Sequence, residues 1–496
     1  ELKAVSTDRY EMIKPVKKQV HYPLSSAQRR LWILSQFEKE SIAYNMPQYR
    51  EFSEDINIEN FEKAIFQTIE RHEILRTVFG ESETGEIRQF IRTVDELNFT
   101  IDHQDYSSLS NKKEVVAYYI NTDAAKPFDL KNGPLLRVAI LKIANNKSIF
   151  YCNMHHIICD GWSMNVLTND VMHFYQALQT EITPMLDPLE IQYKDFAYWQ
   201  QEGLQGNEQK ASANYWQQQF SGELPVLELP TQKKRPLLKT SKGKTLITYI
   251  DVATAKALKT FSNKHDGSLF MGLIAAMNAL FYRYTSQDDF IIGSPSAGRE
   301  HVQLENQIGF YLNTIALRNK VAPTDSFSSL FSKVRNTTFD AYKHQQYPFD
   351  QLVEELKLKR DNSRNPIFDV MLLLQNFNEN EAETIINNPN EINIQGEGFC
   401  KYDFLFTFQE IGEYISMEVN FNTDVYEETL IRDFIKHFKN LLSATLKAPE
   451  TAIKKLAFIS ETEKTTLLET FNATKTSDVA SMKTLVESFE AQAEKT

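Results

Sequence analysis

The 496-residue sequence is poor in the residue types that constrain a backbone or form disulfides. It has three cysteines, Cys152, Cys159 and Cys400, and only 16 glycines and 16 prolines. Three scattered cysteines do not build a disulfide framework, so a reducing cytoplasm is the expected location. We find no internal repeat and no low-complexity tract, which excludes a repeat protein and a disordered scaffold.

Long apolar runs and an excess of positive charge are also absent. No run approaches the roughly 20 apolar residues that cross a membrane, and the first twenty residues are polar and charged, unlike a secretory signal peptide. The formal net charge of −12 argues against nucleic acid or an anionic membrane as a partner. With 42% hydrophobic and 24% charged residues, the chain has an ordinary globular composition. Its length predicts two or three units with separate cores.

The most informative stretch is Met154 to Ser163, where two adjacent histidines precede an acid and a glycine. The residues before it, 148–155, are typical of a buried strand. After Gly161, apolar residues recur at the spacing of a helix. The histidines are therefore predicted to lie at a strand end, in the kind of turn that often holds catalytic groups.

Three interpretations of the histidine pair compete. Adjacent residues of a strand point to opposite faces, so His155 and His156 are not expected to share a metal ion, and we predict no metal site. Both imidazoles could fill hydrogen-bonding roles in a core. Alternatively, one imidazole faces a cavity while the other fixes the strand. The stretch by itself leaves these last two interpretations open.

The rest of the chain alternates predicted helices and strands in two halves, separated near Pro184 and Pro188. Helices are predicted over residues 58–71, 111–125, 268–284, 327–344 and 427–446, and strands over 135–143, 148–155, 367–375, 402–409 and 414–422. Mixed elements in this order predict an α/β (α+β) sandwich.

Seven stretches, in order and at familiar separations, resemble the condensation domain of nonribosomal peptide synthetases. They are SAQRRLW (26–32), RHEILRTVF (71–79), MHHIICDGWS (154–163), YKDFAYW (193–199), IGFYLNTIALR (308–318), HQQYPFD (344–350) and RDNSRNP (360–366). Related acyltransferases share the histidine motif, whereas all seven stretches together are highly specific. They lie within residues 22–370.

The resemblance implies two lobes similar to chloramphenicol acetyltransferase, arranged as a V-shaped pseudo-dimer with a tunnel between them. It divides the chain into an N-terminal lobe (21–182) and a C-terminal lobe (183–454). Residues 1–20 would be a linker from an upstream carrier protein. Residues 455–496 would lead towards an adenylation domain, because Thr484 to Glu490 resembles the opening of such a domain.

The family's activity is amide-bond formation between two carrier-bound thioesters. An upstream donor and a downstream acceptor peptidyl carrier protein would each present a substrate on a phosphopantetheine arm, with no cofactor bound directly by this domain. The acceptor's amine would attack the donor's thioester. The residues around the histidine motif look most like the subtype that joins an L-donor to an L-acceptor. The excised domain is expected to be monomeric. Epimerisation of the donor residue and a non-catalytic platform that recruits carriers or enzymes are the alternatives.

The resemblance also assigns roles to single residues. His156 matches the reactive imidazole, and His155 supports it. Asp160 matches a structural acid that pairs with an arginine, for which Arg299 is the best match. Gly161 matches the position that keeps the tunnel open.

Chemistry leaves two roles open for the reactive histidine. An α-amino group has a pKa of about 7.7–8, so an appreciable neutral fraction exists near pH 7 and no strong base is needed before attack. His156 would accept a proton as the tetrahedral species collapses, or would position the amine by a hydrogen bond.

The remaining assignments concern support of the site. Trp162 and Ser163 follow the histidine motif directly. Asn313 is expected either to line the tunnel or to satisfy backbone groups. The motif arginines are expected to be structural, and they are Arg71, Arg76 and Arg364.

Overall fold

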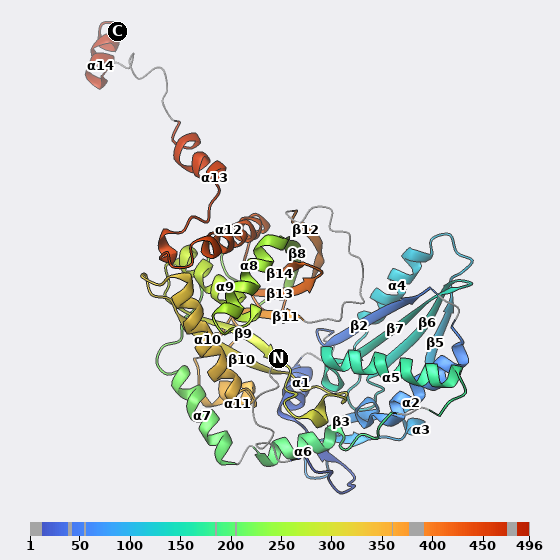
Figure 1. Ribbon diagram of the computed structural model, residues 1–496. Coiled ribbons are helices and arrows are strands. Elements are labelled where there is room, and N and C mark those ends of the chain that lie inside the picture. Colours follow the sequence, from blue (N-terminus) through green and yellow to red (C-terminus); the bar gives the residue numbers. More distant parts are fainter. Residues whose placement is uncertain are drawn as a thin grey trace.

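The computed structural model describes residues 12–37, 42–53, 56–183, 186–203, 206–359, 361–375, 391–473 and 484–495. Residues 1–11 of the predicted upstream linker, Arg360 of the seventh motif, and residues 474–483 and 496 of the predicted downstream linker lie outside the described residues. The predicted α/β class is confirmed, because two lobes of strands and helices lie side by side and splay apart as a V in the view of Figure 1.

The N-terminal lobe contains a four-stranded sheet in the order β2-β7-β6-β5. These strands are β2 (Asn45–Phe52), β5 (Ile101–Asp105), β6 (Leu136–Ala144) and β7 (Lys147–His155). Successive side chains of β6 point to opposite faces of the sheet. Val138 and Ile140 pack in the main core of this lobe, whereas Ala139 and Leu141 pack in a smaller cluster.

Helices cover both faces of this sheet (Figure 1). Helix α2 (Ile58–Arg71) packs along α5 (Gly161–Gln179) in the main core, and α4 (Lys112–Ala124) contributes Val116 to the smaller cluster. Short elements complete the lobe. They are β1 (Tyr22–Pro23), α1 (Ser26–Phe37), β3 (Thr77–Glu81), β4 (Ile87–Ile91) and α3 (Val94–Leu97).

The C-terminal lobe contains a seven-stranded sheet in the order β10-β9-β11-β13-β14-β8-β12. Strand β11 runs parallel to both of its neighbours, β9 and β13, and the other pairs are antiparallel. The strands are β8 (Lys242–Ile250), β9 (Asp289–Ser296), β10 (Asn313–Lys320), β11 (Val370–Gln375), β12 (Asn393–Phe399), β13 (Phe404–Ile411) and β14 (Tyr414–Asn422).

Helix α9 (Leu269–Thr285) is the centre of this lobe, and its residues 269–281 are all buried. Helices α8 (Val252–Lys264), α10 (Phe327–Lys343) and α12 (Glu428–Lys447) pack against it. Helices α6 (Tyr193–Gly203) and α7 (Asn207–Gln219) lie along the lower edge in Figure 1, and α11 (Phe349–Glu355) packs against α7 and α1. Helices α13 (Glu461–Thr465) and α14 (Leu485–Ala493) follow the lobe in sequence.

The division of the cores differs from the predicted boundary at residue 182. Tyr193, Phe196 and Phe310 pack in the core of the N-terminal lobe. The segments that carry them therefore pack against the first lobe. In addition, Ile13 lies within the predicted upstream linker but is buried in the same core.

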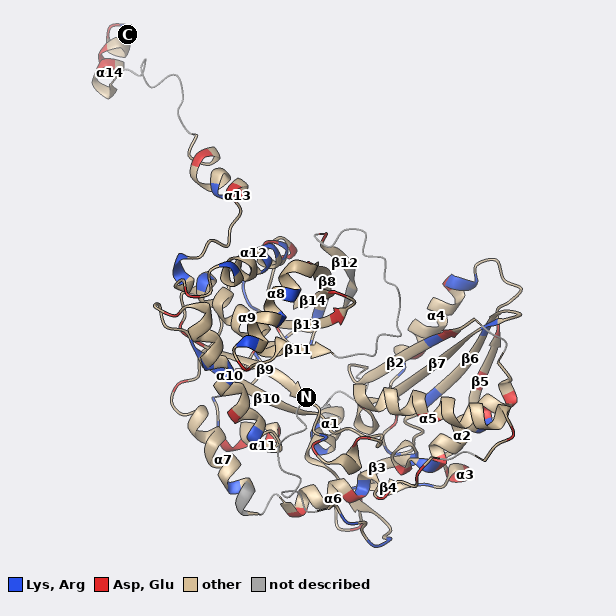
Figure 2. Cartoon of the chain, viewed as in Figure 1, with Lys and Arg blue, Asp and Glu red and all other residues tan. Residues whose placement is uncertain are grey.

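Charged residues of both signs are interspersed over the helices and strands of both lobes in Figure 2. Within the residues that the structure describes, no helix is both long and apolar enough to cross a membrane.

Candidate active site between the lobes

The histidine turn has the predicted arrangement of a strand end followed by a helix. Strand β7 ends at His155, residues His156–Ile158 form one turn of 3₁₀-helix, and α5 begins at Gly161. Asp160 is the N-cap of α5, and its Oδ1 accepts a hydrogen bond of 2.8 Å from the backbone N–H of Ser163. Such a cap fixes where the helix starts, and therefore fixes the turn that precedes it.

His155 has a supporting position. Its imidazole is 4% exposed, and Nδ1 accepts a 3.1 Å hydrogen bond from the backbone N–H of Ile157. The rings of Tyr44 and Phe128 flank it, at centroid distances of 6.2 and 6.0 Å. Burial lowers the pKa of His155 to about 3, with a smaller contribution from His156. The ring is therefore neutral at neutral pH and acts as an acceptor within the turn.

His156 is oriented differently and is half-buried. Its Nδ1 lies 2.6 Å from the carbonyl oxygen of Cys159. Because a carbonyl only accepts, Nδ1 donates, which leaves Nε2 of the neutral ring as an acceptor. The backbone N–H of His156 donates to the carbonyl of Tyr44 (2.8 Å), and its ring packs on Phe310 with 4.7 Å between centroids.

Burial is also the main cause that lowers the pKa of His156 below 6.5, and the charge of Lys401 acts in the same direction. The hydrogen bond to Cys159 and the charge of Asp160 oppose this shift. His156 is therefore a neutral base at neutral pH, with Nδ1 fixed and Nε2 available. Phe310 belongs to the sequence motif 308–318, so this motif supplies one wall beside the imidazole.

Asp160 and Arg299, which the family resemblance matches to each other, form an ion pair, at 3.1 Å from Oδ1 to Nη2. Both side chains are almost fully buried, with 0% and 2% exposure. Oδ1 also accepts from the hydroxyl of Ser163 (2.7 Å), and Oδ2 accepts from the backbone N–H of Tyr311 (3.1 Å). The hydroxyl of Ser163 in turn accepts from the backbone N–H of Gly309 (3.0 Å). These contacts tie the helix start to the motif 308–318.

Arg299 is held by further contacts with its own loop. Nη1 donates to the carbonyls of Leu304 (2.6 Å) and Gln307 (2.7 Å), and the guanidinium lies 4.2 Å from the centroid of Tyr311. Gly298, directly before it, has φ +64°, and a Cβ there would lie 2.1 Å from the carbonyl oxygen of Tyr311. Only glycine fits this position.

Gly161 and Trp162 occupy the exposed side of the helix start. Gly161 is exposed, and an added Cβ would meet nothing within 4 Å. Trp162 is 48% exposed, and its Nε1 donates to the carbonyl of Glu305 (2.9 Å). Open space beside Gly161 agrees with the expected role of this glycine, which stays a prediction.

Asn313 satisfies backbone groups and also lines a pocket between the lobes. Its Nδ2 donates to the carbonyls of Gln345 (2.7 Å) and Tyr347 (2.6 Å), and its Oδ1 accepts from the N–H of Phe349 (3.2 Å). The pocket is also lined by Phe310, by Arg30 and other residues of α1, and by residues of α6. The structure thus brings Asn313 and the wall of the histidine site to one pocket.

The three motif arginines each contact groups outside the histidine turn. Nε of Arg71 pairs with Asp170 on α5 (3.0 Å). Arg76 donates to the carbonyl of Arg92 (2.7 Å). Nη1 of Arg364 pairs with Asp369 (2.7 Å). These contacts join neighbouring segments, and the structural role of the arginines stays a prediction.

Several polar residues that support the turn were not assigned from the sequence. Gln28 on α1 is 0% exposed, and its Nε2 donates to the carbonyl of Ile157 (3.4 Å). The hydroxyl of Tyr193 lies 2.8 Å from Oγ of Ser25 and donates to the carbonyl of Phe310 (2.6 Å). The available signal was a polar Gln28 next to the apolar residues of the motif 26–32, because a buried amide needs a partner.

Cys159 lies within the turn but is fully buried, and burial raises the pKa of its thiol well above the ordinary value. A protonated, buried thiol is a poor nucleophile. Over the ranges that the structure describes, no group of three or more histidine, cysteine, aspartate or glutamate side chains has the arrangement of a metal site.

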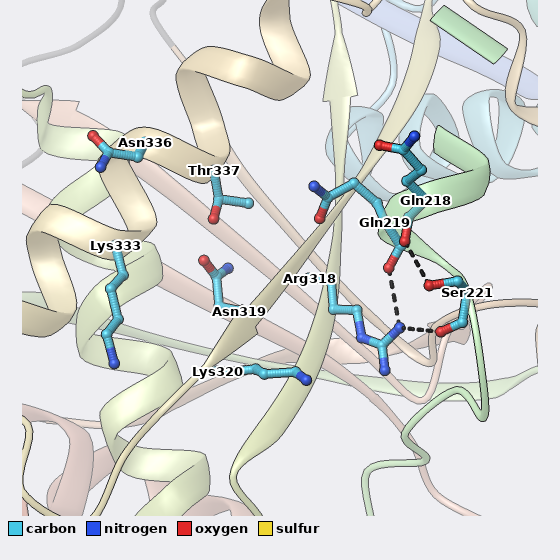
Figure 3. A pocket seen from close by; sticks show the side chains of 9 residues that line it. All are labelled: Gln218, Gln219, Ser221, Arg318, Asn319, Lys320, Lys333, Asn336 and Thr337. Carbon is cyan, nitrogen blue, oxygen red and sulfur yellow. Dashed lines mark hydrogen bonds between the residues drawn. The ribbon is translucent and has the colours of Figure 1, made fainter. Parts of the chain in front are cut away.

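A pocket of about 540 Å³ lies away from the histidine turn, between α7, β10 and α10 (Figure 3). Two of its cations are engaged by acids, since Arg318 pairs with Asp289 and Lys333 with Asp325. None of the residues lining it belongs to the histidine turn, and they are Gln218, Gln219, Ser221, Arg318, Asn319, Lys320, Lys333, Asn336 and Thr337. We therefore place the candidate active site between the lobes.

Solved structures define the class of fold. The chain matches the X-domain in its complex with OxyB from teicoplanin biosynthesis with a TM-score of 0.78 and 20% identity, over 91% of this chain and 99% of that one. It matches the first condensation domain of the calcium-dependent antibiotic synthetase with a TM-score of 0.70 and 17% identity, over 90% and 100%. The fold is thus the two-lobed, chloramphenicol acetyltransferase-like fold predicted from the sequence.

The sequence places the chain in a particular family. Residues 18–468 match the family described as "Condensation domain", so the chain belongs to the condensation domain family. Condensation domains of nonribosomal peptide synthetases are acyltransferases that form amide bonds, which confirms the predicted enzyme class.

Curated relatives are much longer proteins. The chain is 35% identical over 499 residues to bacitracin synthase 3 of Bacillus licheniformis, covering 100% of this chain and 8% of the relative. It is 35% identical over 488 residues to tyrocidine synthase 3 of Brevibacillus parabrevis, covering 98% and 7%. The chain therefore spans less than a tenth of the length of either relative.

Proposed function

We propose that this chain joins a donor aminoacyl or peptidyl thioester to the amine of an acceptor aminoacyl thioester, both carried by proteins. The observation that supports this most is the orientation of His156. Its Nδ1 is fixed by the Cys159 carbonyl, so Nε2 is left as a neutral acceptor beside the pocket wall formed by Phe310.

The proposed reaction begins with the acceptor's amine. Its nitrogen attacks the thioester carbonyl, a C–N bond forms, and the carbonyl electron pair moves to oxygen. When the pair returns, the C–S bond breaks and the sulfur leaves as a thiolate. Nε2 of His156 accepts the proton that the nitrogen loses and passes it to the thiolate, giving an amide and a thiol.

Positioning is the second part of the proposed role. A hydrogen bond from the amine to Nε2 would hold the nitrogen at the thioester carbonyl, and such orientation by itself accelerates a reaction between two tethered groups. We give His156 both roles. Asp160, with Arg299 and Ser163, holds the turn and does not take the proton, because both of its oxygens accept hydrogen bonds from other groups.

The proposed partners are an upstream donor and a downstream acceptor carrier protein with phosphopantetheine arms, and an adjoining adenylation domain. Exposed apolar side chains in the C-terminal segment support a contact with a following domain. They are Leu467, Leu468, Phe471, Leu485, Val486 and Phe489. Several expectations stay predictions. They are the interlobe tunnel, the linkers, the subtype joining an L-donor to an L-acceptor, the monomeric state and the cytoplasmic location.

The decisive experiment loads a donor and an acceptor carrier with a panel of L-aminoacyl groups and adds this chain. Mass spectrometry of the acceptor carrier then detects a dipeptidyl thioester if the proposal is right. If only inversion at the donor's α-carbon is seen, epimerisation replaces it. Binding of the carriers without either product would instead favour the platform. The matched variant His156→Ala should make product far more slowly, and an unchanged rate would remove His156 from the mechanism.

A further inference from the structure

Lys401 is a cation that lies between the lobes. Among the described residues, no carboxylate forms an ion pair with it. It lies just before β13 in the C-terminal lobe, yet its Nζ is 5.5 Å from the ring centroid of Tyr44 in the N-terminal lobe. On its other side, Nζ lies 5.6 Å from the ring of Tyr402. In the part of the chain that the structure describes, its ammonium makes no ion pair and no hydrogen bond.

Tyr44 connects this ammonium to the histidine turn. Its carbonyl accepts the backbone N–H of His156, and its ring lies 6.2 Å from that of His155. The charge of Lys401 also acts on the pKa of His156, which it lowers. The ammonium is therefore within electrostatic reach of the imidazole that the proposed function uses.

The backbone around Lys401 is held firmly. Its carbonyl accepts from Nζ of Lys239 (2.6 Å), and the preceding Cys400 donates its N–H to the carbonyl of Ser241 (2.9 Å). Asp403, two residues later, is paired with Arg235. With the backbone fixed, the rings of Tyr44 and Tyr402 on its two sides limit where the ammonium lies, so less ordering is needed when negative charge develops near it.

The surroundings of Lys401 favour a negative ligand. Burial lowers the pKa of Lys401 to about 7, and the charges of Arg30 and Lys239 add to this effect. About half of the side chains therefore carry the ammonium at neutral pH, and a negative charge beside it raises that fraction. Arg30 on α1 lines the interlobe pocket and, like Lys401, has no ion pair among the described residues. Asp350 lines the same pocket; burial raises its pKa, and the charge of Arg30 opposes that shift. An anion placed here would relieve the repulsion between these cations.

We propose that Lys401 stabilises the negatively charged oxygen that forms when the acceptor amine attacks the donor thioester beside His156. The inference rests on the proposed function. In that step the carbonyl electron pair moves to oxygen as the C–N bond forms, and it returns as the C–S bond breaks. Lys401 carries no proton through the step. It supplies only positive charge.

The test compares Lys401→Met and Lys401→Arg with the unchanged 496-residue chain, using the donor and acceptor pair that gives most product. Removing one preorganised donor to such an oxygen lowers kcat by about 10²–10³-fold. We expect Lys401→Met to lose kcat on this scale with KM for the acceptor carrier little changed. Lys401→Arg should recover most of the rate, because it keeps the charge.

Lys264→Met, on the exposed end of α8, is the matched control and should retain the full rate. Thermal unfolding of all variants separates activity from folding. The inference is overturned if Lys401→Met keeps its kcat, if it changes only KM, or if Lys401→Arg is as slow as Lys401→Met in a folded protein. Absence of product with the unchanged chain would instead refute the proposed function, and this inference with it.

Discussion

The two ends of the histidine turn, four residues apart, differ in how completely their polar atoms are used. At one end, Asp160 accepts hydrogen bonds on both oxygens and pairs with Arg299. At the other end, His156 uses Nδ1 alone and keeps Nε2 available. The Asp160 end, where both oxygens have hydrogen-bond partners, is suited to holding a structure. The His156 end, where one ring nitrogen has none, is suited to acting on a substrate. One short motif thus divides support from chemistry.

The largest expected effect is on activity at the His156 end. His156→Ala should lower the rate of dipeptidyl thioester formation by about 10²–10⁴-fold, because it removes both the proton acceptor and the positioning group. The free energy of unfolding should change little, since the ring is only half-buried. Kinetics and denaturant unfolding measured on one preparation separate the two effects. A large loss of unfolding free energy in His156→Ala would show that His156, like Asp160, holds the structure.

At the Asp160 end the expected effect is on stability. Asp160→Asn keeps the shape but leaves the buried guanidinium of Arg299 without its negative partner, which costs about 3–5 kcal/mol of unfolding free energy. Urea unfolding of the variant and the unchanged chain measures this difference. A variant of undiminished stability that forms no product would show that Asp160 acts in the chemistry.

The neighbouring His155 predicts a dependence of stability on pH. Its folded pKa of about 3 lies below the ordinary 6.5, so its contribution is complete above pH 6.5 and is lost as the pH falls. Each pH unit in this window costs about 1.4 kcal/mol, or about 2 kcal/mol between pH 6.5 and 5. Compared with the unchanged chain, His155→Gln should show a flatter dependence. Urea unfolding at pH 6.5 and 5 gives the change in unfolding free energy for each protein. An equal change in His155→Gln and in the unchanged chain would contradict the assignment.

The smallest expected effect concerns Gly161. Because a Cβ there meets nothing within 4 Å, Gly161→Ala should fold normally and gain up to about 1 kcal/mol from helix propensity. Product formation should nevertheless fall, since the methyl group occupies space that we assign to the substrate. Unfolding and product formation are again the two measurements. A full rate in Gly161→Ala would place the substrate elsewhere.

Local sequence signals predicted many elements of this fold well. Helix α2 has the predicted bounds of 58–71, because its apolar residues recur on one face and Asn57 caps it. By contrast, β2, α8 and β12 were not predicted. Strand β2 contains Pro47 and is mostly exposed, and β12 contains two glycines, so neither has the alternation that marks a half-buried strand.

The candidate site was predictable where the motif itself carries the chemistry. The positions of His155, Asp160 and Gly161 at a strand end and helix start follow from local pattern, and the Arg299 partner followed from the family resemblance. Lys401 and Tyr44 are far apart in sequence and belong to different lobes, so no local pattern predicts that they meet. The choice of His156 over His155 followed from the family resemblance, whereas the ring nitrogen that stays available needed the structure, because it depends on which nitrogen faces a carbonyl.

The protonation of His156 at neutral pH tests the central claim most directly. Histidine-selective ¹⁵N labelling, with the His156 signal assigned by comparison with His156→Ala, reports which ring nitrogen carries hydrogen. We predict a neutral ring with hydrogen on Nδ1 and none on Nε2 at pH 7.5, persisting as the pH is lowered to 6.5. A ring protonated on Nε2, or an imidazolium at pH 7.5, would contradict the proposed role of His156.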